Sequence, residues 1–111
     1  MTVFQKIIDG EIPCEKAYED EDILAFHDIA PQAPVHILVV PKKAIVSVAS
    51  AGQDDQRLLG KAMLVAADLA RRHGLEETGY RLVTNVGPDG GQTVFHLHIH
   101  LMGGRPLRGM G

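Results

Sequence analysis

The sequence predicts an α+β fold in which a five-stranded antiparallel sheet is accompanied by one long and one short helix. Five short apolar segments have the character of strands, whereas only two segments show helical spacing. Consecutive strands are joined by short turns, which favours antiparallel pairing over parallel crossovers. With 111 residues the chain has the length of a single domain.

The first half of the chain contains the short helix and three strands. Apolar residues recur at helical spacing within residues 3–8, and Gly10 follows as a stop signal. Residues 17–19 and 23–26 are two apolar runs separated by an acidic turn, which is the pattern of a hairpin. The segment 35–40 is rich in β-branched residues and predicts a buried strand.

The second half contains the long helix and two strands. Residues 53–73 carry apolar side chains at steps of three and four, and Gly74 is a natural end. Acidic residues in its first turn and basic residues in its last turn match the helix dipole. Residues 80–86 predict a strand, and a glycine-rich turn leads to the last strand over 93–102. The long helix packs on one sheet face, which leaves the other face or an edge for a site.

Composition excludes several classes of protein. The chain is 45% hydrophobic and 23% charged, as in ordinary globular domains. It contains neither the apolar run of about 20 residues that a membrane helix needs nor a long basic run for nucleic acid. The lone Cys14 suits a reducing compartment. We therefore expect a cytoplasmic protein that binds neither membrane nor nucleic acid, with one domain over 1–105 and a loosely held tail over 106–111.

Three of the six histidines fall within five residues of the last predicted strand. Side chains alternate faces along a strand, at about 6.6 Å between residues on one face. One face is then apolar and directed to the core (Phe95, Leu97, Ile99, Leu101), and the other carries the histidines (His96, His98, His100). Three interpretations remain open: a solvated polar face, a zinc site built from imidazoles, or a catalytic cluster.

The residues around this strand favour chemistry on a phosphate. Glycines 90 and 91 allow backbone N–H groups to approach an anion, and Gln92 and Thr93 add side-chain donors. Asn85 either reaches the same pocket or caps the turn. His36, in an apolar strand, is either a satisfied core residue or a fourth member of the cluster. The two other histidines are interpreted as structural: His27 and His73.

These segments resemble the histidine triad superfamily. Residues 96–102 have its His-φ-His-φ-His-φ-φ pattern, where φ is apolar, and residues 90–95 are similar to its Hint branch, the histidine triad nucleotide-binding proteins. Three further segments resemble that branch: residues 4–8, 25–34 and 36–43. The similarity runs from about residue 2 to residue 105.

The resemblance implies a homodimer whose two sheets join into one ten-stranded sheet. It implies hydrolysis of P–N bonds in purine nucleoside 5′-phosphoramidates and of the P–O bond in aminoacyl adenylates. The implied reaction runs through a nucleotidyl-histidine intermediate and releases the nucleoside monophosphate. The resemblance implies no metal or other cofactor.

The resemblance also implies residue roles. His98 matches the nucleophile, and His100 matches a contact to the phosphate and the leaving group. His96 and His36 match positions that orient the nucleophile and relay protons. Asp28 matches the acceptor of the ribose hydroxyls. The remaining matches are the base pocket (Phe4, Ile7, Phe26, Ile29) and the phosphate cradle (Asn85, Gly91, Gln92, Thr93).

One segment departs from the branch. Hint proteins often end in Trp-Pro-Pro-Gly, whereas residues 105–111 contain no tryptophan. The resemblance therefore does not indicate which leaving group this protein prefers. Two other functions remain open. One is a dinucleoside polyphosphate hydrolase of the sister branch, and the other is a non-catalytic module that binds nucleotide or zinc.

Overall fold

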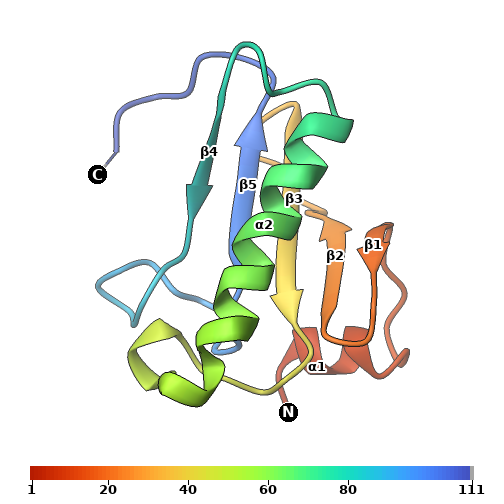
Figure 1. The fold of residues 1–111 in the computed structure, drawn as a ribbon, viewed down its shortest axis with the longest axis vertical. Coiled ribbons are helices and arrows are strands. Elements are labelled where there is room, and N and C mark those ends of the chain that lie inside the picture. Colours follow the sequence, from red (N-terminus) through yellow and green to blue (C-terminus); the bar gives the residue numbers. More distant parts are fainter. Residues whose placement is uncertain (111) are drawn as a thin grey trace.

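A five-stranded antiparallel sheet in the order β1-β2-β3-β5-β4 forms the centre of the structure, a computed structural model that describes residues 1–110 (Figure 1). The strands are β1 (Lys16–Glu19), β2 (Ile23–His27), β3 (Val35–Pro41), β4 (Tyr80–Val83) and β5 (Ile99–Gly103). The helices are α1 (Val3–Ile8) and α2 (Gln56–Arg72), and α2 is preceded by the short 3-10 turns η1 (Val48–Ser50) and η2 (Gln53–Asp55). The predicted fold class is confirmed.

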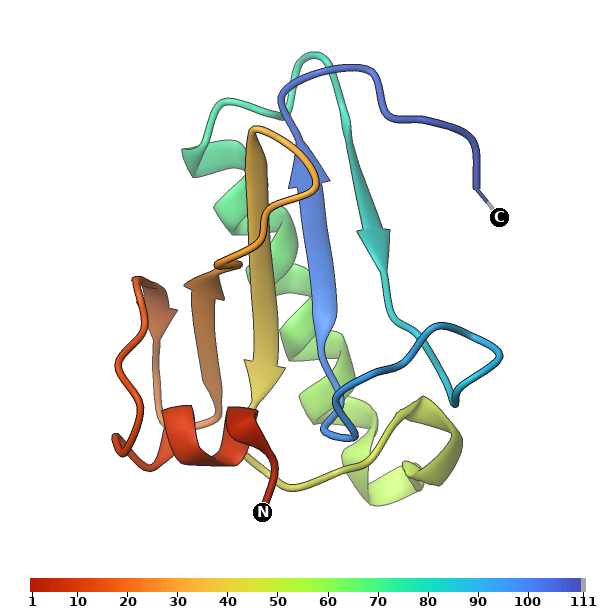
Figure 2. The same ribbon diagram turned by 180° about the vertical axis from the view of Figure 1, so that it is seen from behind.

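The two helices cover opposite faces of the sheet (Figure 2). Inward residues of one strand face pack with α2 into the main core; they include Ile23, Ala25, Ile37, Val39, Ile99 and Leu101. The alternate residues of β2 and β3 pack against α1 in a smaller cluster; they are Leu24, Phe26, Leu38 and Val40, with Phe4 from the helix. Alternation of side chains along each strand thus gives the sheet two apolar faces. The smaller one covers only part of its face.

Small side chains set the close approach of α2 to the sheet. Its buried residues are three alanines and one leucine (Ala62, Ala66, Ala70, Leu69), at helical spacing. Gly74, with a φ of 74°, follows the end of the helix in a conformation that disfavours other residues. The prediction of a helix over 53–73 was right in place, although residues 53–55 form a separate 3-10 turn. No helix within residues 1–110 is both long and apolar enough to cross a bilayer.

The last strand is shorter than predicted, because regular pairing begins only at Ile99. In the residues before it, side chains occupy backbone carbonyls that a neighbouring strand would otherwise bind. The His98 ring donates to the carbonyl of His96, and the Gln92 amide donates to the carbonyl of Val94. Leu97 is fully buried as expected, but Phe95 is 47% exposed and does not face the core. Strict alternation therefore fails over residues 93–98.

Two other predicted boundaries lie elsewhere. β4 ends at Val83 rather than at residue 86, and the Thr84 hydroxyl next to it donates to the carbonyl of His98 at 2.8 Å. After β5 no helix or strand is found in residues 104–110, and Gly111 lies outside the described residues. The loosely held tail over 106–111 stays a prediction.

Burial within α2 predicts a sharp difference between two identical substitutions. Leu69 is 1% exposed in the main core, whereas Leu64 on the same helix is 73% exposed. We expect Leu69→Ala to lower the free energy of unfolding by about 2–5 kcal/mol, because it leaves a cavity. Leu64→Ala should change it by less than about 0.5 kcal/mol. Urea unfolding followed by circular dichroism measures both, and equal losses would contradict this assignment of the core.

Candidate active site

One cavity of about 320 Å³ lies on the α1 face of the sheet. It brings together eight of the residues predicted for the site: Phe4, Ile7, Phe26, Asp28, Ile29, Thr93, His98 and His100. The apolar members come from α1, β2 and the loop after β2, and the polar members come mainly from the start of β5 and the segment before it. The cavity is therefore an apolar chamber with histidines and one carboxylate along one side.

The ring of His98 is held in one tautomer by the backbone. Its Nδ1 lies 2.7 Å from the carbonyl oxygen of His96, and because a carbonyl only accepts, Nδ1 carries the proton and donates it. A neutral ring then has a lone pair on Nε2, which has no partner within residues 1–110 although His98 is only 7% exposed. No fully enclosed side-chain nitrogen or oxygen in that part of the chain lacks a partner, so Nε2 retains access to the cavity. His98 thus presents a basic nitrogen to the cavity.

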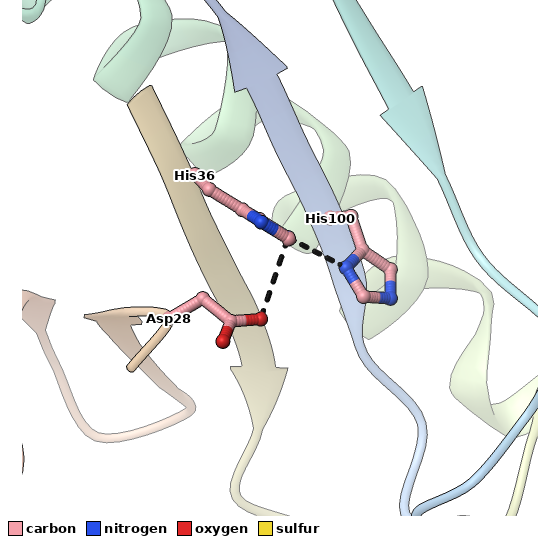
Figure 3. A group of neighbouring side chains, drawn as sticks. All are labelled: Asp28, His36 and His100. Carbon is pink, nitrogen blue, oxygen red and sulfur yellow. Dashed lines mark hydrogen bonds and ion pairs between the residues drawn. The ribbon is translucent and has the colours of Figure 1, made fainter. Parts of the chain in front are cut away.

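His36, His100 and Asp28 form a second polar group beside His98 (Figure 3). The Nε2 of His36 lies 2.9 Å from the Nδ1 of His100 and 3.5 Å from a carboxylate oxygen of Asp28. On its other side, the Nδ1 of His36 accepts the backbone N–H of Gln32 at 3.0 Å. In neutral His36 the proton must therefore be on Nε2, from which it is donated to His100. His100 in turn keeps its own proton on Nε2.

Burial keeps these three histidines neutral. Loss of solvent lowers the pKa of His98 and of His36. The bond to the His96 carbonyl partly opposes the shift of the His98 pKa, and the Asp28 carboxylate opposes both shifts. Burial, together with the neighbouring His98 and His36, lowers the pKa of His100 to about 4. At neutral pH these three imidazoles are therefore uncharged, two at the cavity and His36 behind them, and each can donate at one nitrogen and accept at the other.

Five of the predicted site residues do not line the cavity. His36 lies beneath it, and buried His96 donates through Nε2 to the Pro41 carbonyl at 2.7 Å, so its ring does not share the cavity with the other two triad histidines. The Gln92 amide is buried, and its bonds go to the backbone of Gly87, Val46 and Val94. Asn85 donates to the carbonyl of Gly90, as expected of a residue that caps the turn, and Gly91 has a φ of 85° there. Asn85, Gly91 and Gln92 therefore shape the loop before β5 and do not face the cavity.

The cavity also contains residues that the sequence did not single out. They are Val3, Ile12, Pro13, Cys14, His27, Leu38 and Val94. His27, interpreted as structural, lies at the cavity wall while its ring packs edge-on against that of His73 at 5.7 Å between centroids. Residues 12–14 follow α1 without a regular pattern, and therefore no periodic signal places them at the site. Leu38 could have been found, because it alternates with His36 on the same strand face.

A metal ion fits the polar group poorly. Within residues 1–110, the one set of three potential ligands whose atoms lie within 4.8 Å of one another is Asp28, His36 and His100, not the three triad histidines. A histidine that binds metal through one nitrogen carries a proton on the other and donates it to an acceptor. The Nδ1 of His36 faces the N–H of Gln32, which is itself a donor. If His36 bound a metal through Nε2, its proton would be on Nδ1 and would face the Gln32 N–H, which is also a donor.

Comparisons with known proteins agree with this architecture. The family model of the HIT domain matches residues 9–107. The chain belongs to the HIT family. An uncharacterized HIT-like protein of Synechococcus elongatus is 57% identical to it over 106 residues, which are 96% of this chain and 92% of that protein.

Two solved HIT structures are similar throughout. A HIT family hydrolase from Legionella pneumophila has a TM-score of 0.95 and 49% identity, and the match covers 97% of this chain and 96% of that one. A histidine triad nucleotide-binding protein from Candida albicans has a TM-score of 0.83 and 30% identity, over 100% of this chain and 87% of that one. The predicted superfamily is confirmed.

The lowered pKa values of the site histidines predict a loss of stability in mild acid. A histidine whose pKa is lower in the folded state stabilises the fold fully above its unfolded value of about 6.5, and this contribution is lost as the pH falls toward the folded pKa. Because the pKa of His100 falls to about 4, His100→Gln should flatten the decline between pH 6.5 and pH 5 by about 1–2 kcal/mol. Urea unfolding of both proteins at several pH values measures this. Parallel curves for the two proteins would contradict it.

Proposed function

We propose that this protein hydrolyses purine nucleoside 5′-phosphoramidates through a nucleotidyl intermediate on His98, as a member of the Hint branch. One observation carries the proposal: the bond of 2.7 Å from His98 Nδ1 to the carbonyl of His96 leaves a basic Nε2 at the cavity. A neutral imidazole in that state is a nucleophile for phosphorus at neutral pH. The HIT hydrolase and the histidine triad nucleotide-binding protein among the similar structures support the same class of reaction.

The cavity suits a nucleoside. Phe4, Phe26 and Ile7 form an apolar wall against which a flat purine base can pack. Ile29, at the rim, is 99% exposed, so a base that covers it removes apolar surface from water. The Asp28 carboxylate is partly accessible and can accept hydrogen bonds from ribose hydroxyls.

In the first step, His98 Nε2 attacks the α-phosphorus in line, and a P–N bond to the histidine forms as the P–N bond to the amine breaks. An amine leaves as a neutral molecule only if it receives a proton. His100 Nε2–H supplies that proton, and the His36 Nε2–H, whose nitrogen lies 2.9 Å from His100 Nδ1, stabilises through its hydrogen bond the electron pair left on the His100 ring. The nucleotidylated His98 ring becomes positively charged. Its Nδ1–H remains on the His96 carbonyl, whose dipole stabilises that charge.

In the second step, water attacks the same phosphorus and the bond to His98 breaks. The water gives its proton to the nitrogen of His100 that protonated the amine, so that residue acts first as an acid and then as a base. The products are the nucleoside monophosphate and the free enzyme in its starting protonation state. Charge on the phosphoryl oxygens is stabilised by fixed donors near Thr93, which lines the cavity, while Asn85, Gly91 and Gln92 hold the shape of that loop.

The His98 variant provides the main test. We expect His98→Ala to abolish release of AMP from adenosine 5′-phosphoramidate, because it removes the Nε2 that attacks phosphorus in the proposed first step. Wild-type enzyme quenched during turnover should carry an adenylyl group on His98, as detected by mass spectrometry of peptides. His73→Ala, outside the cavity, is the matched control and should keep its activity. Full activity of His98→Ala would overturn the mechanism.

The same assay separates the other candidate functions. Faster turnover of diadenosine polyphosphates than of phosphoramidates would place the protein in the sister branch. Binding of AMP without any turnover would indicate a binding module. We expect the activity to persist after dialysis against EDTA, which would exclude an essential metal. A bound zinc ion in a protein without turnover would support the zinc-binding alternative.

The edge of the sheet suits the proposed homodimer. β4 is the outermost strand, and β5 pairs with only one of its sides. Next to it is an apolar groove of about 160 Å³ whose walls include Val48 and Met63, which are 41% and 47% exposed. Pairing of β4 with β4 of a second copy about a two-fold axis would join the sheets into ten strands and cover this groove.

A charge in that groove should separate the two copies. Met63→Glu places a carboxylate on the apolar surface and should convert a dimer into a monomer in sedimentation velocity. Leu64→Glu is the control, since Leu64 is more exposed, at 73%, and lies outside the groove. A wild-type protein that sediments as a monomer at micromolar concentration would refute the dimer.

A further inference from the structure

Three consecutive hydrogen bonds connect the C-terminal segment to the cavity. The Nη2 of Arg105 donates to the carbonyl of Gln32 at 2.9 Å, and the N–H of Gln32 donates to the Nδ1 of His36 at 3.0 Å. The Nε2 of His36 lies 2.9 Å from the Nδ1 of His100. We propose that Arg105 is a positioning residue that, through Gln32, fixes the tautomer of His36 and directs the proton of His100 toward the leaving group. This inference rests on the proposed function.

The direction of this chain is decided at Gln32. Two neutral imidazoles that share one hydrogen bond can do so in either direction, and neither ring by itself prefers to be the donor. The backbone N–H of Gln32 can only donate, so it requires a lone pair on His36 Nδ1 and a proton on Nε2. Without that amide, His100 Nδ1 could donate to His36 instead. The Nε2 of His100 would then carry a lone pair where the amine needs a proton.

Gln32 lies in the loop between β2 and β3, and Arg105 ties this loop to the end of β5. Within the loop, the Ala30 N–H donates to Asp28 and the Gln32 side chain donates to the Ala30 carbonyl. At the base of the loop, the Asp28 N–H donates to the His36 carbonyl. The Arg105 bond instead comes from a residue 73 positions further along the chain. Gly104, with a φ of 101°, allows this approach, since a Cβ there would lie 2.9 Å from the Pro34 ring. The guanidinium thus holds the loop from outside.

The consequence depends on the leaving group. An alkylamine must be protonated as its bond to phosphorus breaks, whereas p-nitrophenolate leaves without a proton. Loss of the Arg105 bond should therefore slow phosphoramidates of alkylamines and have little effect on the p-nitrophenyl ester of AMP. A general disturbance of the cavity would slow both substrates equally.

The kinetic test compares three variants on these two substrates. We expect Arg105→Ala to lower kcat for the alkylamine phosphoramidate by roughly five- to tenfold, as for the loss of one charge-assisted hydrogen bond, with KM unchanged. The ester should change by less than about twofold. Arg105→Lys retains one charged donor and should restore part of the rate. Arg108→Ala removes an exposed arginine that forms no ion pair or side-chain hydrogen bond within residues 1–110, and should leave both rates unchanged.

A spectroscopic readout tests the inference without turnover. In two-dimensional 15N–1H spectra of the imidazoles, wild-type His36 should be the Nε2–H tautomer, and Arg105→Ala should show a mixture of both tautomers. An unchanged His36 tautomer in Arg105→Ala, or equal loss of rate on both substrates, would overturn the role of Arg105. Absence of turnover in the wild-type protein would instead count against the proposed function, and the tautomer of His36 would still decide this inference.

Discussion

The hydrogen bond from the His98 ring to its neighbouring His96 carbonyl is the interaction on which the site depends. It keeps residues 96–98 out of the regular ladder, so β5 begins only at Ile99. It also fixes which nitrogen of His98 is basic, and in the proposed mechanism it retains a carbonyl dipole next to the ring when the ring gains charge. One hydrogen bond therefore determines both where β5 begins and which nitrogen of His98 is basic.

The main apolar core and the cavity lie on opposite faces of the sheet. On one face, α2 approaches closely through alanines and forms the larger apolar core. On the other, the short α1 packs against β2 and β3 (Figure 2). The cavity lies on this face, with Phe4 and Ile7 of α1 in its wall. Strand alternation connects the two, because Ile37 and Ile99 anchor the core while their neighbours His36, Leu38, His98 and His100 face the opposite side. The buried core thereby holds the histidines rigidly without including them.

Periodicity could predict the elements but not the bonds between them. The apolar stripe of α2 and the buried strand at residues 35–40 were placed correctly, because hydrophobic spacing reports directly on burial. The alternation of three histidines with apolar residues failed for His96, because its ring binds the Pro41 carbonyl on a strand 55 residues away. Sequence periodicity also did not predict that the Gln92 amide binds the Val46 carbonyl, or that the Gln32 N–H binds the His36 ring. Such contacts depend on where the folded backbone places a carbonyl or amide, and no local pattern encodes that. Family resemblance supplied Asp28, Ile29 and Phe4, which periodicity alone did not select and which the structure places at the cavity.

The apolar wall of the cavity has a consequence for selectivity among bases. The side chains of Phe4, Ile7, Phe26 and Ile29 offer surface for the flat faces of a ring but neither donor nor acceptor for its edge. A hydrophobic pocket discriminates weakly between molecules of similar shape, whereas a missing hydrogen-bond partner produces strong discrimination. If the cavity binds a nucleotide as proposed, this wall would distinguish bases by size and only weakly by their exocyclic groups. Adenine and guanine would present almost the same surface to it.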